Sequence, residues 1–533
     1  MAGHFKNMAL VSLATLGSRV LGLVRDVLSA AFFGAGVFNT AFNFAFTLPN
    51  MFRRMLGEGA LTSALIPVLN GVLERDREKA AFSFLNRVVT RTFLTLLVLT
   101  GIMCALMGVG LWIVDVFQSN SGGADIAGGA SQRWDLGFTY AIVLMPYMIL
   151  VCLAAVQAAA LNVLRRFAIA GLSQVWLNLS MIASLGVCGW LLADTAQGRM
   201  NWMCAGVLFG GILQVGIPGV YLWKLGWRPK FDLRCCEAIS EVQRLILPGL
   251  IGACILQINV VVSRFLAMCV DDSAVTLLYY SSRLVELPLG LFTVAAVTVL
   301  FPSLSGFAAR GDRDGFVAEY ARGLRLIWAV AVPAAIGLIV LREPVIDLLF
   351  RWGHFDVKDV SLLAPVIAVS ALCMPFYSLS TFATRGLHAF KDMRTPMKIA
   401  LWAFLANLVA SLVLMKPLGA VGLAGANLFS AALQSFLLQR SLAGSGCDFS
   451  KARFKGAFVH IATAAAVMAG VAWICWRGIV SWVGFGKLAD SMAVCLVIPC
   501  AIAVYFWVLC ACGFEDSALL KDFCARFLGR AKR

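Results

Sequence analysis

Arginines inside apolar segments are the residues of this sequence that could do chemistry. Arg19 and Arg25 lie in one long apolar stretch, Arg53 lies in the next, and Arg283 lies in a third stretch far along the chain. A charged side chain at the centre of a bilayer costs about 2.5–3.5 kcal/mol on the insertion scale, so each needs an aqueous cavity or an anionic partner. A guanidinium group with spare donors can bind a phosphate or carboxylate bidentately. These arginines therefore predict an anion-binding site at membrane depth.

Neighbouring acids neutralise some of these arginines but not all of them. Asp26 directly follows Arg25, and Glu58 stands four residues after Arg54, which is the spacing of an ion pair on one helix face. That pairing leaves Arg53 formally unneutralised, next to a proline and two glycines that weaken the helix. A self-contained salt-bridge network is the alternative interpretation of this segment.

The segment around Arg283 mirrors the one around Arg53. Arg283 and Glu286 lie one helical turn apart, and Pro288 follows them. Across the three segments, five arginines stand against three acids, which leaves a net charge of +2. This balance fits an anionic ligand such as a diphosphate, and it opposes a cavity for cationic drugs.

Transmembrane helices must position these residues. Of 533 residues, 61% are apolar and 14% are charged, and the mean hydropathy is +0.86; soluble proteins have about 25% charged residues. Long continuous apolar runs exclude a soluble enzyme and a transmembrane β-barrel. We therefore expect an all-α polytopic membrane protein with about 14 transmembrane helices. The apolar runs lie at residues 8–33, 38–72, 84–117, 135–162, 169–193, 201–223, 242–269, 274–305, 321–349, 360–388, 396–415, 418–439, 456–480 and 489–512.

Lys and Arg residues are distributed unevenly over the connections between these spans. The two termini and the even-numbered connections carry 28 of them, and the odd-numbered connections carry eight. The positive-inside rule then predicts that both termini are cytoplasmic. The excess of 44 basic over 28 acidic residues thus reports topology, and we expect no nucleic-acid partner. Eight further arginines lie within or at the ends of spans: Arg19, Arg25, Arg53, Arg54, Arg91, Arg264, Arg283 and Arg385.

Two pairs of short segments repeat along the chain. Residues 64–69 resemble 299–304, and 160–166 resemble 386–392, at offsets of 235 and 226. Both pairs lie six spans apart, which predicts two six-helix lobes in a parallel pseudo-repeat plus two C-terminal helices. We expect an N-terminal lobe at 1–225 with spans 1–6 and a C-terminal lobe at 226–445 with spans 7–12. Spans 13–14 and a cytoplasmic tail occupy 446–533.

Cofactor signatures are absent from the sequence. The 16 cysteines and four histidines lack the spacing of metal ligands, and no Walker A pattern occurs. We predict no metal, no cofactor and no ATP hydrolysis.

Six motifs carry a resemblance to a known family. They are SRVLGLVRD at 18–26, FGAG at 33–36, LPNMFRRMLGEGAL at 48–61, LYYSSRLVELPLG at 278–290, LFPSLS at 300–305 and KDMRTPMKIA at 391–400. The sequence resembles the MurJ/MviN family, the lipid II flippases of the multidrug/oligosaccharidyl-lipid/polysaccharide exporter superfamily. The resemblance implies two lobes around a cationic cavity, and a groove in the last two helices for a polyprenyl tail. It implies substrate-binding roles for Arg19, Arg25, Arg53 and Arg283, and supporting or gating roles for Ser18, Asp26, Asn50, Arg54, Glu58 and Glu286.

Two positions depart from the family pattern. Many members carry an acid early in the second span, where this chain has Asn39 and Thr40, and another directly before the eighth-span arginine, where it has Ser282. Both differences make the expected cavity less acidic.

The resemblance implies a transporter and not an enzyme. Its expected activity is to flip lipid II, or a similar polyprenyl-diphosphate lipid, from the cytoplasmic to the outer leaflet of the bacterial inner membrane by alternating access. We expect a monomer whose partners are this substrate and membrane lipids. The alternatives are a flippase for another polyprenyl-diphosphate glycan, a cation or drug antiporter of the same superfamily, and a membrane transferase. The antiporter is opposed by the cavity charge, and the transferase by the lack of an acidic cluster within a span.

Overall fold

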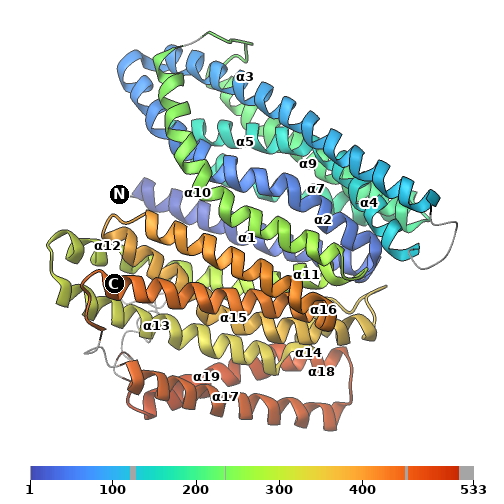
Figure 1. The fold of residues 1–533 in the computed structure, drawn as a ribbon, viewed down its shortest axis with the longest axis vertical. Coiled ribbons are helices and arrows are strands. Elements are labelled where there is room, and N and C mark those ends of the chain that lie inside the picture. The colour runs from blue at the N-terminus through green and yellow to red at the C-terminus, as the bar shows by residue number, and fades with distance from the viewer. Residues whose placement is uncertain (1, 121–127, 235, 450–453, 515, 517–533) are drawn as a thin grey trace. The chain divides into compact units, whose positions relative to one another are not determined.

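The computed structural model describes residues 2–120, 128–234, 236–449, 454–514 and 516. Within these ranges, side chains are not described at residues 2–14, 58–60, 77, 118, 120, 128, 247–249, 251–253, 255–256, 291–292, 294–295 and 455. Every regular element of the described chain is helical (Figure 1). A helix satisfies its own backbone hydrogen bonds, which is what a segment in lipid requires. The all-α prediction is therefore confirmed.

The first compact unit consists of Met1–Thr276 and Trp352–Phe355. Its elements are α1 (Ala2–Phe33), α2 (Val37–Phe52), η1 (Arg53–Ala60), α3 (Leu61–Asn120), α4 (Gly128–Leu144), α5 (Pro146–Val163), α6 (Phe167–Gly171), α7 (Ser173–Ala183), η3 (Ser184–Gly189), α8 (Trp190–Leu192), α9 (Ala196–Lys224) and α10 (Glu237–Met268). The elements labelled η are π-helical segments. The short segment at 352–355 belongs to this unit because the amide of His354 donates to the carbonyl of Ala31 at 2.8 Å.

The second compact unit consists of Leu277–Arg351 and Asp356–Arg533. Its elements are α11 (Ala274–Pro288), whose first turn falls in the first unit, η4 (Leu289–Thr293), α12 (Val294–Ala309), α13 (Arg313–Val340), α14 (Arg342–Leu349), α15 (Val357–Ala389), α16 (Arg394–Gly444), α17 (Phe454–Val483), α18 (Lys487–Met492), η6 (Ala493–Val497) and α19 (Ile498–Ala511).

Ten helical segments of the described chain are long and apolar enough to cross a membrane. One of them, α16, contains two predicted spans and breaks at Gly419, whose φ of 56° and ψ of −133° are not helical. Shorter apolar helices at Gln257–Met268 and Ala296–Ala309 fall in the seventh and eighth predicted spans, and α1 covers the first. Each predicted span therefore coincides with helical structure.

Two helix ends have the same backbone geometry in the two units. Arg165 and Lys391 have φ of 60° and 62°, the left-handed region that few residues other than glycine adopt. At both turns the amide of the next residue donates to the carbonyl five positions earlier, at 2.7 and 3.1 Å. The two turns are 226 residues apart, as the sequence repeat predicts.

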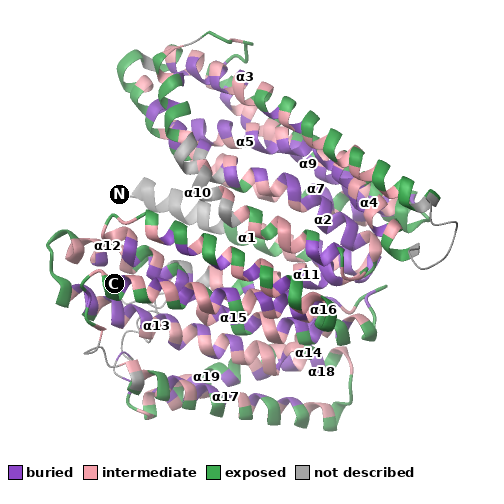
Figure 2. Ribbon diagram, viewed as in Figure 1, coloured by how far each residue is buried: buried purple, intermediate pink, exposed green. Residues whose placement is uncertain are grey.

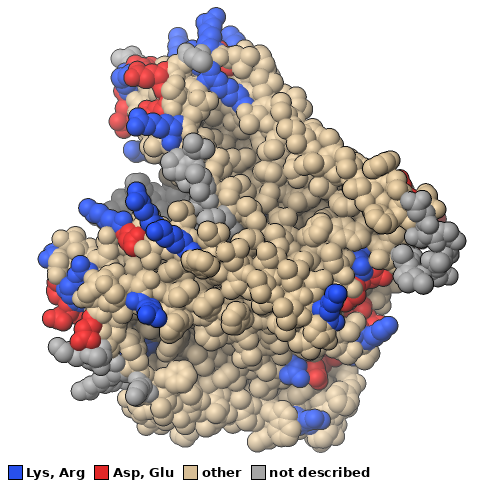
Figure 3. Space-filling view, viewed as in Figure 1, with Lys and Arg blue, Asp and Glu red and all other residues tan. Residues whose placement is uncertain are grey.

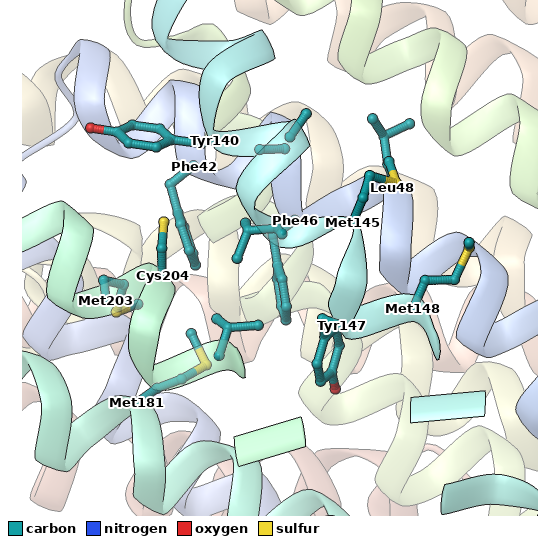
Figure 4. Packing of buried hydrophobic residues seen from close by; sticks show 14 of the residues in the cluster. Phe42, Phe46, Leu48, Tyr140, Met145, Tyr147, Met148, Met181, Met203 and Cys204 are labelled. Atoms are coloured by element: carbon teal, nitrogen blue, oxygen red, sulfur yellow. The ribbon is translucent and has the colours of Figure 1, made fainter. Parts of the chain in front are cut away.

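The core of the first unit lies among α2, α4, α5, α7 and α9. Figure 4 shows Phe42 and Phe46 side by side, with Tyr147 next to Phe46; the ring centroids of Phe42 and Phe46 are 5.6 Å apart. The buried Tyr147 hydroxyl donates to Gln214 Oε1 at 3.1 Å, which satisfies its polar end. In Figure 2, α2 is mostly buried, whereas much of α3 is intermediate or exposed, as expected of a helix that contacts lipid.

Two glycines let α9 approach α7 and η3 closely. A Cβ on Gly206 would lie 2.7 Å from the Ser184 Cβ, and one on Gly210 would lie 3.0 Å from the Leu177 Cα. The two glycines are four positions apart, with three residues between them, which is the spacing of a small-residue contact between transmembrane helices. Ser180 Oγ adds a hydrogen bond to the carbonyl of Gly206 at 2.7 Å.

In the second unit, the C-terminal helices pack on α13. Tyr505 on α19 is buried, and its hydroxyl donates to the carbonyl of Ala329 at 2.7 Å. Arg325 Nε on α13 donates to Asp516 Oδ2 at 2.7 Å just beyond α19. These contacts attach spans 13 and 14 to the rest of this unit. On the face shown in Figure 3, most Lys, Arg, Asp and Glu side chains gather toward the left and right of the view, and the surface between them is largely free of these residues.

The first compact unit extends beyond the lobe boundary expected after residue 225. Helix α10 packs on η1 and α3 of this unit. Just after α10, Asp272 pairs with Arg133 at the start of α4, with Nη1 and Oδ1 2.7 Å apart. The repeat-based division into lobes stays a prediction, because the boundary of a repeat need not coincide with the boundary of a packed unit.

Candidate anion-binding site

A distorted helix positions Arg53. Pro49 lacks a backbone donor inside α2, and the chain then passes into the π-helical η1, whose first residue is Arg53. The glycines at 57 and 59 have weak helix propensity, so this segment can take the wider geometry that often marks functional sites. Arg53 is partly buried, and its Nε donates to Asn50 Oδ1 at 3.2 Å. The distortion predicted from Pro49 and the glycines is therefore present.

Arg19 and Arg54 are exposed in the first unit. Among the described residues, Arg19 makes no hydrogen bond or ion pair. The side chain of Glu58 lies outside the described residues, so the Arg54–Glu58 pair stays a prediction. The guanidinium groups of Arg19 and Arg54 are thus accessible to a ligand.

Arg25 has a different environment, because it is 5% exposed and Asp26 is 3% exposed. Its Nη2 and Nε lie 2.6 and 3.0 Å from Asp26 Oδ1. Its Nη1 donates to Asn178 Oδ1 at 3.2 Å and lies 3.8 Å from Met181 Sδ. Each nitrogen of this guanidinium therefore contacts a protein group, and Arg25 joins α1 to α7.

Arg283 is the predicted ligand-binding arginine of the second unit. Its Nη2 and Nε donate to the Tyr279 hydroxyl at 2.8 and 3.2 Å, and its guanidinium carbon lies 4.9 Å from the centre of the Tyr279 ring. Glu286 is more distant, with Oε2 3.6 Å from Nη1, and its side chain is 54% exposed. The adjacent Tyr280 is buried and stacks on Phe350, with ring centroids 4.6 Å apart. The phenol of Tyr279 thus orients Arg283 and adds no negative charge, while the Tyr280 contact anchors the helix.

The two arginine-bearing segments share their distortion. Pro49 precedes the π-helical η1, and Pro288 directly precedes the π-helical η4. π-Helical segments within α-helices occur frequently at functional sites. The same local device therefore occurs in both units beside a predicted ligand-binding arginine.

The other intramembrane arginines bind groups of the protein itself. Arg91 Nη2 donates to the carbonyl of Leu233 at 2.9 Å, and Arg264 Nη1 donates to the carbonyl of Val275 at 3.0 Å. The guanidinium of Arg385 lies 5.6 Å from the centre of the Phe301 ring. Arg91 and Arg264 are half-buried and Arg385 is exposed, and each has a contact within the protein.

Neutral groups occupy the two positions that depart from the family pattern. Asn39 is buried, and its Nδ2 donates to the carbonyl of Gly34 at 2.9 Å. Its Oδ1 accepts from Ser29 Oγ and from Asn43 Nδ2, each at 3.1 Å. Ser282 Oγ donates to its own helix, at the carbonyl of Tyr279. A carboxamide fits the site at Asn39 because the site supplies both donors and an acceptor.

Sequence reasoning missed Tyr279 and Asn178. The i, i+4 spacing of Tyr279 and Arg283 could have indicated the first contact. No sequence signal links Asn178 to Arg25, because 153 residues separate them. The described residues contain no group of three or more His, Cys, Asp or Glu that could hold a metal ion.

Comparison with known proteins places this geometry in a family. A family model described as "Lipid II flippase MurJ" matches residues 29–493. A Vibrio cholerae protein described as "Probable lipid II flippase MurJ" is 31% identical, over 97% of this chain and 97% of its own length. The chain belongs to the MurJ lipid II flippase family. A Burkholderia cenocepacia protein described as "Lipid II flippase MurJ" is 29% identical, over 96% of this chain and 98% of its own length.

Solved structures agree on the fold. A structure titled "Lipid II flippase MurJ, inward closed conformation" aligns with a TM-score of 0.72 at 23% identity, covering 98% of this chain and 100% of that one. A multidrug resistance MATE family transporter of the MOP superfamily, in an inward-facing conformation, aligns with a TM-score of 0.63 at 12% identity. The alignment covers 80% of this chain and 95% of that one. The predicted family and fold class are confirmed. The chain is an integral membrane protein of a transporter family, and not an enzyme.

Proposed function

We propose that this chain flips lipid II, the undecaprenyl-diphosphate-linked precursor of peptidoglycan, from the cytoplasmic to the outer leaflet of the bacterial inner membrane. The observation that carries the proposal is membership of the MurJ family, with 31% identity over 97% of the chain. The polar head of such a lipid cannot cross about 30 Å of hydrocarbon unaided, because each unpaired polar group costs several kcal/mol there. A protein path is needed.

The arginines would bind the diphosphate. Arg19 and Arg54 are exposed, and the Arg53 and Arg283 side chains are partly so. Guanidinium groups bind phosphate oxygens bidentately and keep their charge at any physiological pH. The neutral partners Asn50 and Tyr279 hold two of these groups without cancelling their charge. Each of these arginines therefore keeps a positive charge for a doubly negative headgroup.

The C-terminal helices would hold the lipid tail. A pocket of about 400 Å³ lies among α17, α18, η6 and α19, and Ile479, Trp482, Met492 and Leu496 are among its lining residues. Apolar side chains dominate this lining, which suits an isoprenoid chain and cannot solvate a sugar. This pocket supports the proposal that spans 13 and 14 form a hydrophobic groove.

Alternating access would move the headgroup across the membrane. The division of the chain into two compact units supports a mechanism in which packed bodies rearrange. The matched π-helical segments after Pro49 and Pro288 are the proposed flexing points. We further propose that both termini lie in the cytoplasm, on the basis of the charge distribution over the connections, and that the protein acts as a monomer.

Complementation tests this proposal. A bacterium depleted of its own lipid II flippase is given this protein, and lipid II in the outer leaflet is measured together with growth. We expect the wild type to restore both, and Arg19→Ala and Arg53→Ala to lose most of the activity at unchanged membrane levels. Arg75→Ala is the control, because Arg75 forms an exposed pair with Asp76 and should keep full activity.

Two results would contradict the proposal in different ways. Rescue that persists after both Arg19→Ala and Arg53→Ala would refute the site assignment. A correctly inserted wild type that does not rescue would instead favour a flippase for another polyprenyl-diphosphate glycan.

A further inference from the structure

A buried carboxamide on α7 contacts α1 at two points. Asn178 is 6% exposed. Its Oδ1 accepts from Arg25 Nη1 at 3.2 Å, and its Nδ2 donates to the backbone carbonyl of Ser18 at 3.0 Å. A carboxamide can make both contacts at once because it carries an acceptor and a donor on one planar group.

The two points of contact lie on one face of α1. Ser18 and Arg25 are seven residues apart, which is about two helical turns and roughly 10 Å along the axis. Gly22 lies between them, and a Cβ there would be 3.6 Å from Asn178 Nδ2. The glycine thus leaves room for the carboxamide to lie against the α1 backbone.

Arg25 completes this contact from the side of α1. Asp26 occupies two of its nitrogens, and Asn178 and Met181, both on α7, face the third. Asn178 and Met181 are one turn apart, so they present the same face of α7. Because the Nη1 donor of Arg25 meets these α7 groups only when the two faces oppose each other, the α1–α7 contact is specific to one rotation of α1.

We infer that Asn178 is a positioning residue for the headgroup site. It fixes the rotation and height of α1 against α7, because its contact at Ser18 holds the backbone next to Arg19. Arg19 is exposed one residue further along the helix, and successive side chains on a helix point about 100° apart. A small rotation of α1 would therefore move this guanidinium away from a bound diphosphate. The inference rests on the proposed function, in which Arg19 binds that group.

Binding of undecaprenyl diphosphate to the full-length protein in nanodiscs tests the inference. We expect Asn178→Leu, which keeps the volume and loses both contacts, to weaken binding roughly tenfold, the scale of one hydrogen bond to a charged group. The matched control is Asn407→Leu. Asn407 is also buried, at 2% exposed, and donates to Asn427 Oδ1 at 2.9 Å within the second unit. This control should bind as the wild type does, even at an equal loss of thermal stability.

A second readout reports on α1 directly. A spin label introduced through an unnatural amino acid at position 20, where Val20 is 55% exposed, should become more mobile in Asn178→Leu and not in Asn407→Leu. A purely stabilising role for Asn178 predicts equal changes in both variants, and that result would overturn the inference.

Asn178→Asp provides a variant with a retained partner for Arg25. The carboxylate keeps the acceptor but loses the donor to the Ser18 carbonyl, so we expect weaker binding than in the wild type. Wild-type affinity in this variant or in Asn178→Leu overturns the inference and leaves the proposed function intact. A wild-type protein that does not bind the probe overturns the proposed function, and the inference with it.

Discussion

Replacing Arg351 with Met should loosen the attachment of the C-terminal helices in the second unit. Arg351 lies just after α14, where its Nε is 3.2 Å from Asp347 Oδ1 and its Nη2 is 3.7 Å from Asp490 Oδ2 on α18. Lys487, also on α18, donates to the backbone carbonyl of Asp347. Two bases and two acids thus connect α14 to the start of the last span, and Asp490 is only 2% exposed.

The burial of the Arg351–Asp490 pair sets the expected loss of stability in Arg351→Met. An ion pair at this separation near a protein surface has a gross attraction of about 4 kcal/mol, much of which desolvation offsets. Removing one partner of a buried pair leaves the other uncompensated and costs about 3–5 kcal/mol. The Arg351 side chain is 27% exposed and that of Asp490 is 3% exposed. We therefore expect the lower end of this range, a loss of about 3 kcal/mol in the free energy of unfolding.

Thermal unfolding of the detergent-solubilised protein measures this loss. The control is Arg75→Met, because the side chains of the Arg75–Asp76 pair are 78% and 41% exposed, and such pairs contribute about 0–1 kcal/mol. Adding Asp490→Asn to Arg351→Met should recover part of the stability, since it removes the uncompensated charge. The electrostatic reasoning is refuted if Arg351→Met unfolds at the same temperature as Arg75→Met. It is also refuted if the double variant with Asp490→Asn unfolds at a lower temperature than Arg351→Met alone.

Two further predictions concern packing and pH. Gly210→Ala should destabilise the protein by about 1–3 kcal/mol through overpacking, because the added Cβ would meet the α7 backbone at 3.0 Å. Gly216→Ala on the same helix is the control, since a Cβ there has nothing within 4 Å. It should be neutral or slightly stabilising in the same thermal assay. The backbone amide of Arg234 and the guanidinium of Arg87 lower the pKa of Asp232 in the connection after α9. The ionised Asp232 carboxylate therefore stabilises the fold above the ordinary carboxylate pKa. This stabilisation is lost as the pH falls through the lowered pKa of Asp232 in the folded protein. The protection factor of the Arg234 amide, its exchange rate relative to an unstructured peptide at the same pH, should therefore fall on acidification in the wild type. Asp232→Asn should abolish that pH dependence, and an unchanged profile in the variant would contradict this assignment.

Hydropathy and local spacing determined the class of this protein and the position of its spans. A segment in lipid must satisfy its backbone internally, so a long apolar run has few structural options. The distortions after Pro49 and Pro288 were also readable from sequence, because proline removes a donor from its own helix whatever packs against it. The repeat at Arg165 and Lys391 was also readable from sequence, because the geometry of a helix end is set by residues next to each other in the chain.

Only the tertiary structure decided which arginines are occupied by the protein and which are accessible. Arg25 and Arg19 lie in the same apolar stretch, yet Arg25 is buried against Asn178, 153 positions further along the chain, while Arg19 is exposed. Arg264 likewise uses its charge on a backbone carbonyl. A charged side chain takes whatever donor or acceptor folding brings within about 3 Å. Partners from distant helices leave no periodic pattern in a single sequence, so the division of these arginines into buried, partnered groups and exposed groups had to come from the fold.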